Sequence, residues 1–450
     1  MNCRMQGFIR RPTPANAGGR RASLLVGLLW CLMLLSVVVV GVLHTARMDL
    51  LVQKNYGDRI QARYLALAGI EKARALLYRE ARDRSHSRKN HSGNYYDDAA
   101  QFQNVALGRG TFSIIRRGRA DEGGGILYGV SDEESRLNVN AASADELGRL
   151  QNMTPAVAEA IVNWRGSGST AVAETEYYEG MKPPYQPRLA PFQTVRELLM
   201  VRGVEPADLL GRDRHQNGLL AAGDANDFAV PGEVDSEDLG WAGVLTVDSS
   251  VQNVNAAGED RVNIQTADEN ALSRLHGVTP QIAHAIVSYR GQHQFQSIVD
   301  LLDVTPPPDQ GGLGGDQSGG AVVSTDLFVD LADDITTSGS EPLAGAINVN
   351  TAELEVLTCL PGISRELAQA IISRRQSSGY FNNIGELLKV SNLTPDLLKQ
   401  IAPLITTRSE TYRILGEGRI KSTGVRQRIQ AVIRIGLNNQ QVLSWREDDL

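Results

Sequence analysis

The sequence predicts an α+β protein with a long N-terminal transmembrane helix, a small antiparallel-sheet head and a large inserted α-helical domain. Three observations predict this fold class. A basic leader precedes an apolar run without charges, from Ser23 to Leu43. One 29-residue passage occurs three times without a gap, at residues 137–165, 262–290 and 347–375. Strand-like segments are expected before the first copy and after the last, and the one at 428–435 alternates apolar and polar residues.

The first 43 residues predict a retained membrane anchor. Residues 1–22 contain five arginines and no Asp, Glu or Lys, and the 21 uncharged residues that follow can cross a bilayer as a helix. Basic residues on the amino side place that end in the cytoplasm. A cleaved secretory signal is the alternative, but its apolar region is usually about 7–15 residues long and ends at small residues. This run is longer, and Leu43-His44-Thr45-Ala46 is a poor cleavage site.

The anchor helix is predicted to continue beyond the membrane. Apolar residues recur at helical spacing on one face, and no Gly or Pro gives a firm break from Leu43 to Tyr56. The face consists of Ile60, Tyr64, Leu67, Ile70 and Leu77. We therefore expect one helix, first apolar and then amphipathic, from about Leu24 to Arg82.

Each repeat copy reads as helix, tight turn, helix. The second helix starts at Thr154-Pro155, Thr279-Pro280 or Ser364-Arg365, and a hydroxyl N-cap followed by Pro is a strong start signal. For the first helices, the sequence predicts caps at Ser143 with Glu146, at Thr266 with Glu269, and at Thr351. In the second helices, apolar residues three and four apart predict one buried face: Ala158, Ile161, Val162, Ala283, Ile286, Val287, Ala368, Ile371 and Ile372.

A shorter echo follows each copy, beginning at Phe192, Phe295 and Phe381. Each echo has one acid just before Leu-Leu: Glu197, Asp300 or Glu386. An acid near a helix N-terminus is favoured by the helix dipole, so a structural role explains these acids. Residues 392–405 again begin a helix with Thr-Pro and predict a further hairpin.

The repeats resemble the helix-hairpin-helix family. Their turn residues are Asn152, Met153 and Thr154, then Gly277, Val278 and Thr279, then Gly362, Ile363 and Ser364. Family members that bind DNA usually carry Gly-hydrophobic-Gly there, which lets backbone N–H groups approach a phosphate. The second glycine is Thr or Ser in all three copies, and the first copy also lacks the first glycine.

Charge also disfavours DNA binding. The chain has 45 Lys and Arg against 52 Asp and Glu, a net charge of −7. Residues 205–260 contain twelve acids and two arginines. Duplex binding usually requires a basic surface, so we expect the hairpins to have a structural or protein-binding role.

The N-terminal region resembles type IV pilins and pseudopilins, whose long helix is embedded in the membrane and packs on a globular head. The resemblance implies prepilin-peptidase cleavage between Ala22 and Ser23. The residue before the cut is usually Gly, and the fifth residue of the mature chain is usually Glu; here they are Ala22 and Gly27. The K subunit of type II secretion systems characteristically lacks that Glu. A carboxylate in lipid needs a partner, so a subunit without one suits the tip of a fibre.

The combination of anchor, head and hairpin repeats resembles the type II secretion minor pseudopilin K family, also called general secretion pathway protein K, over about residues 20–450. The resemblance implies a pilin-like α/β head interrupted by a helical insert, with head strands at 111–117, 428–435 and 441–447. The expected divisions are a leader (1–22), a transmembrane segment (23–43), its amphipathic continuation (44–82), the first part of the head (83–136), an insert with repeats one and two (137–304), a Pro/Gly linker (305–320), a return segment (321–346), the third repeat unit (347–408) and the C-terminal strands of the head (409–450).

The sequence predicts no enzyme activity and no cofactor. Nucleophile, zinc and nucleotide-binding motifs are missing, and His276, His284 and His293 do not have the spacing of a zinc site. Cys3, Cys31 and Cys359 predict no intrachain disulfide after processing. The family resemblance implies possible calcium ligands, which we cannot assign. The candidates are Asp224, Asn226, Asp227, Asp235, Asp330, Asp333 and Asp334, and solvated loop acids are the alternative.

These observations predict a non-enzymatic tip subunit of a pseudopilus that assists protein export across the outer membrane. The expected location is the inner membrane, as a single-pass protein with a cytoplasmic N-terminus and a periplasmic head. The expected partners are other pseudopilins, prepilin peptidase, and secreted substrate or the outer-membrane channel; nucleic acid is not expected. The alternative is a membrane-anchored DNA receptor of the competence type.

Overall fold

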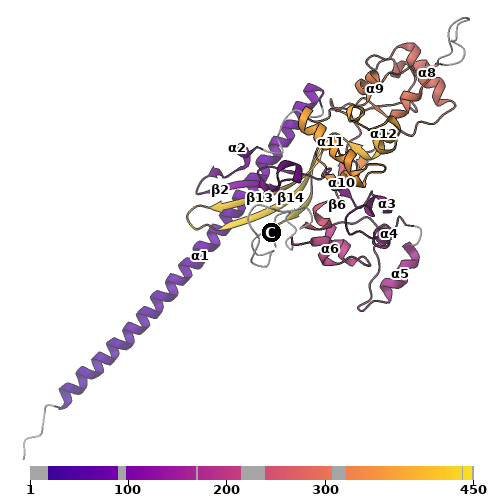
Figure 1. Ribbon diagram of the computed structural model, residues 1–450. Coiled ribbons are helices and arrows are strands. Elements are labelled where there is room, and N and C mark those ends of the chain that lie inside the picture. Colours follow the sequence, from indigo (N-terminus) through magenta and orange to yellow (C-terminus); the bar gives the residue numbers. More distant parts are fainter. Residues whose placement is uncertain are drawn as a thin grey trace, which may run out of the picture. The chain divides into compact units, whose positions relative to one another are not determined.

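The computed structural model describes residues 19–89, 98–168, 171–213, 239–306, 321–437 and 439–447 (Figure 1). The chain divides into two compact units, Met1–Ile60 and Gln61–Leu450. Helix α1 (Gly19–Ser87) belongs to both, since it continues across the boundary.

Helix α1 confirms the predicted continuous helix and extends it at both ends. Its large apolar side chains from Leu24 to Val52 are exposed. Among the described residues, the helix from Leu24 onward is the one long and apolar enough to cross a membrane. The described apolar segment of the first unit, from Leu24 to Val52, therefore exposes its large side chains.

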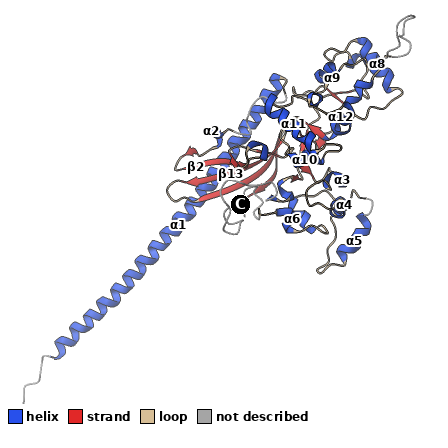
Figure 2. Ribbon diagram, viewed as in Figure 1, coloured by secondary structure: helices blue, strands red, loops and turns tan. Residues whose placement is uncertain are grey.

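The second unit contains the predicted antiparallel sheet, shown in red in Figure 2. Its strand order is β1-β2-β13-β14-β15, with two short strands attached: β3 pairs with β2, and β4 pairs with β13. The bounds are β1 (Val105–Leu107), β2 (Gly110–Arg117), β3 (Ile126–Leu127), β4 (Ser131–Asp132), β13 (Thr411–Ile420), β14 (Arg426–Ile435) and β15 (Gln440–Arg446). Helix α2 (Ala99–Phe102) and the 3₁₀ helix η1 (Ala120–Glu122) flank β1 and β2 in the chain.

Three of these strands confirm the segments named from the sequence, because β2, β14 and β15 cover 111–117, 428–435 and most of 441–447. Strand β1 precedes β2, so residues 111–117 are not the first strand of the head. The apolar side of β14 is buried throughout: Ile429, Ala431, Ile433 and Ile435.

One face of the sheet packs against the second-unit part of α1. Ala66, Ile70, Ala73 and Leu77 of the helix share a core with inward residues of β2, β13 and β14. Strand β13 approaches the helix so closely that a Cβ at Gly418 would lie 1.9 Å from the carbonyl oxygen of Ala62. The contact between helix and sheet thus depends on small residues.

The chain from β5 to β12 forms the helical insert, and its repeats are closed units. Each unit begins with a two-residue strand that carries the first repeat residues. It ends when a second short strand pairs with the first in parallel. The pairs are β5 (Leu137–Asn138) with β6 (Leu245–Thr246), β8 (Val262–Asn263) with β9 (Ile335–Thr336), and β11 (Ile347–Asn348) with β12 (Ile405–Thr406).

Each unit contains two hairpins in succession, and the echo becomes the 3₁₀ helix that begins the second hairpin. The first unit has α3 (Ala144–Leu147), α4 (Pro155–Trp164), α5 (Ala171–Glu179), η2 (Val195–Met200), α6 (Pro206–Leu210) and η4 (Trp241–Gly243). The second has α7 (Glu269–Leu272), α8 (Pro280–Arg290), η5 (Ile298–Asp303) and α9 (Thr325–Leu331). The third has α10 (Leu354–Cys359), α11 (Arg365–Ser378), η7 (Ile384–Lys389), α12 (Pro395–Ile401) and η8 (Ala402–Leu404). A small antiparallel pair, β7 (Ser250–Val251) with β10 (Leu343–Ala344), joins the segments between units.

The structure changes the expected role of one segment. Residues 321–346 were expected to be a return segment, but α9 and β9 lie within them and complete the second unit. Phe328 and Leu331 of α9 are buried in the same continuous core as the hairpin helices. A helix that buries two large apolar side chains is part of the unit's core, not a connection.

The predicted helix starts are confirmed for the second helices and partly wrong for the first. Thr154, Thr279 and Ser364 are the N-caps of α4, α8 and α11, and Ser143 with Glu146 forms the predicted capping box. Asp268, not Thr266, caps α7, and Glu353, not Thr351, precedes α10. In both units the first helix starts later than predicted, because the residues after the strand form a turn before it.

Candidate functional site

The hairpin turns lie where the sequence predicted them and share one backbone shape. Their first residues have a left-handed conformation, with φ of 61° at Asn152, 77° at Gly277 and 73° at Gly362. Asn tolerates this conformation better than most other residues, so the first copy keeps the turn without glycine. The middle residues Met153, Val278 and Ile363 are buried in the core of the insert.

The third turn residues are the N-caps of the following helices. The hydroxyls of Thr154, Thr279 and Ser364 accept hydrogen bonds from the third N–H group of that helix at 3.2–3.3 Å. The middle residues donate their own N–H groups to carbonyls three residues earlier, just after the preceding helix, as from Met153 to Leu150 at 3.1 Å. Several donors that a phosphate would need are therefore used within the fold.

In each copy, an arginine near the end of the hairpin's second helix binds backbone carbonyls near the start of the copy. Arg165, Arg290 and Arg375 each donate to two carbonyls near the start of their own copy. For Arg375 these acceptors are Val349 at 2.9 Å and Ala352 at 2.8 Å. The guanidinium groups of these arginines are used for hydrogen bonds within the units, so they are not free to contact DNA.

An amide side chain links each copy to its echo. Asn140, Gln265 and Asn350 accept from the backbone N–H of the echo phenylalanine, at 2.7, 3.0 and 2.8 Å. The echo acids accept from the backbone N–H four residues earlier: Glu197 from Gln193, Asp300 from Gln296 and Glu386 from Asn382. Their predicted structural role at the start of a short helix is thus confirmed.

The segment between head and insert carries a cluster of three buried acids, Asp132, Glu133 and Glu134, which the sequence analysis did not single out. Asp132 accepts from the side chains of Asn348 at 3.0 Å, Ser409 at 2.5 Å and Thr351. These partners belong to the third repeat unit and its exit, whereas Asp132 lies on β4 of the head. The acid therefore ties the head to the insert.

Glu134 extends the same junction. Its carboxylate accepts from the backbone N–H of Ser250 at 3.1 Å and of Thr411 at 3.1 Å. Burial, followed by the nearby charge of Asp132, raises the pKa of Glu134 well above its usual value. The protonated form of Glu134 is therefore favoured in the folded protein.

Glu133 has the opposite electrostatic environment. Its carboxylate forms an ion pair with Arg413 at 2.7 Å and lies 4.0 Å from the guanidinium of Arg136. Burial alone would raise the pKa of Glu133, but the guanidinium of Arg413 holds it below its usual value. Two guanidinium groups thus share one fully buried carboxylate.

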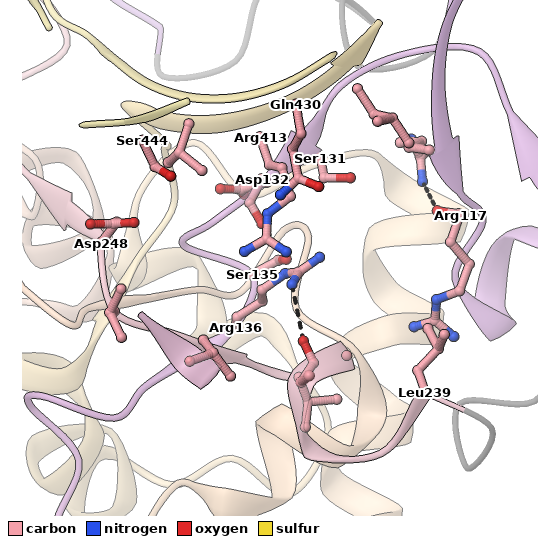
Figure 3. Close-up of a pocket in the computed structure, with 18 of the residues that line it drawn as sticks. Arg117, Ser131, Asp132, Ser135, Arg136, Leu239, Asp248, Arg413, Gln430 and Ser444 are labelled. Atoms are coloured by element: carbon pink, nitrogen blue, oxygen red, sulfur yellow. Dashed lines mark hydrogen bonds between the residues drawn. The ribbon is translucent and has the colours of Figure 1, made fainter. Parts of the chain in front are cut away.

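A cavity of about 390 Å³ lies beside this junction, between the second face of the sheet and the insert (Figure 3). Ile115, Leu415, Gln430 and Val432 of the sheet line it, together with residues from β4 to Arg136 and from η4 to Asp248. Its volume is within the usual range for small-ligand sites.

The other residues considered from the sequence do not come together as a site. Ala22 and Ser23 lie within α1. Asp224, Asn226, Asp227 and Asp235 are outside the described residues, and so is Cys3. Asp333 accepts from Arg261 at 3.0 Å, and Asp334 accepts from Asn255 at 2.9 Å. No group of three or more His, Cys, Asp or Glu that could hold a metal is present in the described ranges.

The histidines and cysteines that are described also lie apart. His284 contacts Glu269 at 2.9 Å, and His293 stacks on Tyr289. Cys31 is exposed on α1 and Cys359 is buried, where burial raises the pKa of its thiol to about 12. Such a thiol is inert at neutral pH.

Comparison with curated proteins gives partial matches. The chain is 31% identical over 156 residues to endonuclease/exonuclease/phosphatase family domain-containing protein 1 of Xenopus laevis, covering 32% of this chain and 26% of that protein. The mouse protein of that name is 27% identical, with 32% and 27% covered. Protein YhgF of Escherichia coli is 41% identical over 59 residues, covering 13% of this chain and 8% of that protein. The chain thus spans about a quarter of the length of the first two relatives.

A solved structure matches over most of the chain. It is a chain of the GspK-GspI-GspJ complex from the enterotoxigenic Escherichia coli type 2 secretion system. The match covers 89% of this chain and 99% of that chain, with 11% identity and a TM-score of 0.43.

Two family descriptions match the sequence directly. The helix-hairpin-helix motif matches residues 258–306 and 344–406, which lie in the second and third repeat units. The first domain of type II secretion system protein K matches residues 130–211, which include the junction acids and most of the first unit. These two matches show that the chain is similar to type II secretion system protein K over residues 130–211 and has helix-hairpin-helix regions in its second and third repeat units.

Proposed function

We propose that this chain is a minor pseudopilin at the tip of a type II secretion pseudopilus and that it assists protein export as a non-enzymatic assembly subunit. The observation that carries the proposal is the match of residues 130–211 to protein K, in a chain that also has a single apolar N-terminal helix. The apolar part of that helix would pack among the helices of other pseudopilins. The hairpin units, whose arginines and turn donors are used internally, would enlarge the head without binding nucleic acid.

The proposal includes processing and placement in the inner membrane. Residues 1–22 would form a cytoplasmic leader that prepilin peptidase removes after Ala22, and residues 23–43 would cross the membrane. The head would then lie in the periplasm, within reach of secreted substrate or the outer-membrane channel. Position at the tip follows from Gly27, because a subunit without a buried carboxylate has no charge to pair with a subunit above it.

The deciding experiment is sequencing of the N-terminus of the membrane-inserted chain, with and without prepilin peptidase. We expect a mature chain that begins at Ser23 only when the peptidase is present. Ala22→Gly should be processed at least as completely, whereas Ala22→Arg should remain uncut. A chain that keeps residues 1–22 in the presence of the peptidase would refute the pseudopilin assignment.

A second candidate function, DNA binding, is favoured by the helix-hairpin-helix match alone. It is tested by a mobility-shift assay of the detergent-solubilised chain with duplex DNA at about 150 mM salt, near physiological ionic strength. We expect no shift, because the net charge is −7 and the repeat arginines are anchored inside the units. A salt-dependent shift would make the receptor hypothesis the better one.

A further inference from the structure

The cavity between the sheet and the insert is rich in arginine. Seven arginines line it, against four acids, although the chain as a whole carries more acids than bases. The arginines are Arg116, Arg117, Arg119, Arg136, Arg196, Arg413 and Arg446. A wall of this composition in an acidic chain points to an anionic ligand.

Most of these charges already have partners. Arg116 pairs with Glu122 at 2.8 Å, Arg119 lies 3.2 Å from Asp121, and Arg117 pairs with Glu353. Their guanidinium groups hold the lining in shape. They are not the groups that would bind a ligand.

Arg136 is different, because the described contacts of its guanidinium are long. It donates one long hydrogen bond of 3.4 Å to the carbonyl of Ala242 and lies 4.0 Å from Glu133. Arg413 takes the short contacts with that carboxylate, at 2.7 and 3.1 Å. Burial, followed by the charge of Arg413, lowers the pKa of Arg136 to about 10, as expected for a guanidinium that is incompletely compensated. Figure 3 shows Arg136 and Arg413 at the centre of the lining, with Asp248 and Ser444 on one side.

From this geometry we propose that the cavity is a binding site for a carboxylate group, which Arg136 holds with its guanidinium fork beside the Arg413–Glu133 pair. A planar carboxylate can accept two parallel hydrogen bonds from one guanidinium. The group can belong to a small organic acid or to an acidic side chain of a peptide. The site is independent of the proposed function.

The acids in the wall favour a carboxylate over a phosphate. Asp132 and Asp248 both line the cavity, and burial followed by the charge of Glu133 raises the pKa of Asp248 to about 6. A singly charged ligand can be offset by the one guanidinium that is incompletely paired. A doubly charged phosphate would add a second negative charge close to these acids.

The test is isothermal titration calorimetry of the full chain in detergent, at constant ionic strength set with chloride. The probes are propionate, the acetylated and amidated peptide Ala-Glu-Ala, and inorganic phosphate, so that both carboxylate probes carry a single charge. We expect a carboxylate probe to bind with a dissociation constant of about 1 mM or tighter, and more tightly than phosphate. Stronger binding of propionate indicates a free organic acid as the source, whereas stronger binding of the peptide indicates an acidic side chain of a partner.

Three variants assign the binding to the cavity. Arg136→Gln should weaken it at least tenfold, and Arg419→Gln, at an exposed position of β13 outside the lining, should leave it unchanged. Ser444→Phe, at an exposed position of the edge strand β15, should fill the space and abolish binding even if the Arg136 variant fails to fold. No binding of either carboxylate probe, tighter binding of phosphate, or equal binding by Ser444→Phe would overturn the proposal.

Discussion

At the residue scale, each repeat unit contains one arginine that donates to two backbone carbonyls of its own unit. Arg375 is the most enclosed: it donates to two carbonyls of its own unit and forms an ion pair with Asp121 of the head at 2.8 Å. Burial lowers the pKa of Arg375. The two carbonyls and Asp121 hold its guanidinium in place. Removal of such a partner leaves buried acceptors unpaired, which costs more than the bond itself contributes.

We therefore expect Arg375→Gln to destabilise the chain by about 2–4 kcal/mol. The neighbouring Arg374→Gln is the matched control, because Arg374 is only half-buried and its one described bond is to Ser378 in the same helix. Denaturant unfolding in detergent measures both. Equal stability of the two variants would show that the hydrogen bonds and ion pair of Arg375 do not contribute to the free energy of unfolding.

The pKa values of the adjacent buried acids Glu133 and Glu134 are shifted in opposite directions, so we expect their contributions to stability to change in opposite directions with pH. The pKa of Glu134 is raised, so the folded state binds more protons than the unfolded state above the ordinary pKa of Glu, and stability falls as the pH rises. Glu134→Gln mimics the protonated form and should make the chain more stable than the wild type at pH 8, with a smaller gain at pH 5. Unfolding free energies at the two pH values measure this effect.

Glu133→Gln is the matched control for this pair. The pKa of Glu133 is lowered through Arg413, so its contribution to stability is present above the ordinary pKa of Glu and is lost as the pH falls. The variant should therefore be less stable than the wild type, with the larger deficit at pH 8. If both variants shift stability in the same direction at pH 8, the two environments are not opposite.

At the element scale, the hairpins require a turn shape more than a particular residue. Asn152 and the equivalent glycines all have positive φ, and Asn392 at the turn of the further hairpin has φ of 67°. That hairpin was predicted at 392–405, where α12 and η8 lie. Its first helix is η7, which precedes the predicted range, and Leu393 is buried in the turn. The same backbone turn thus recurs with either Gly or Asn.

Asn152→Ala should destabilise the chain by about 1 kcal/mol, because a Cβ without a polar side chain disfavours the left-handed conformation. Asn152→Gly should be neutral to within about 0.5 kcal/mol, since glycine enters this region freely. Chemical denaturation distinguishes the two. A larger loss with Gly than with Ala would mean that the Asn side chain, not the backbone, holds the turn.

The contact between α1 and β13 also belongs to this scale. A methyl group at Gly418 would meet the backbone of Ala62 at 1.9 Å, whereas at Gly436 the nearest atom would be 3.6 Å away. Gly418→Ala should cost about 2–3 kcal/mol through overpacking, and Gly436→Ala should be within about 0.5 kcal/mol of the wild type. Thermal unfolding measures both, and an equally stable Gly418→Ala would show that helix and strand can separate without cost.

At the scale of the whole second unit, the buried acids connect parts of the chain that are far apart in sequence. Asp132 and Asn348 are separated by 216 positions, and Asp132 and Ser409 by 277. Strand β13 follows the third repeat unit directly and pairs with both β2 and β4. Head and insert are therefore coupled through Asp132 and its partners.

Asp132→Ala should make the head and the third repeat unit open together. Hydrogen exchange of the full chain should show lower protection both in β13 and in α11, because the hydrogen bonds of Asn348, Thr351 and Ser409 lose their shared acceptor. Asp330→Ala, at an exposed position of α9, should leave both segments protected. Loss of protection in one of the two segments alone would show that they are separate cooperative units.

The sequence by itself determined the local structure. Charge and apolar length predicted α1, the repeat predicted the hairpin helices and their caps at Thr154, Thr279 and Ser364, and alternation predicted β14. These features depend on residues within one or two turns of each other, so their signals are local. The repeated arginines and amides were visible in the aligned copies, but their acceptors were not.

Only the tertiary structure decided how the units close and where a ligand can bind. The closing strands are two residues long, α9 lies beyond a Pro/Gly stretch, and β13 carries glycines whose purpose is contact with α1. Asp132, Glu133, Glu134 and Arg136 adjoin the first repeat, yet their environments come from residues more than 100 positions away. Burial and charge pairing depend on such long-range neighbours, and local periodicity carries no information about them.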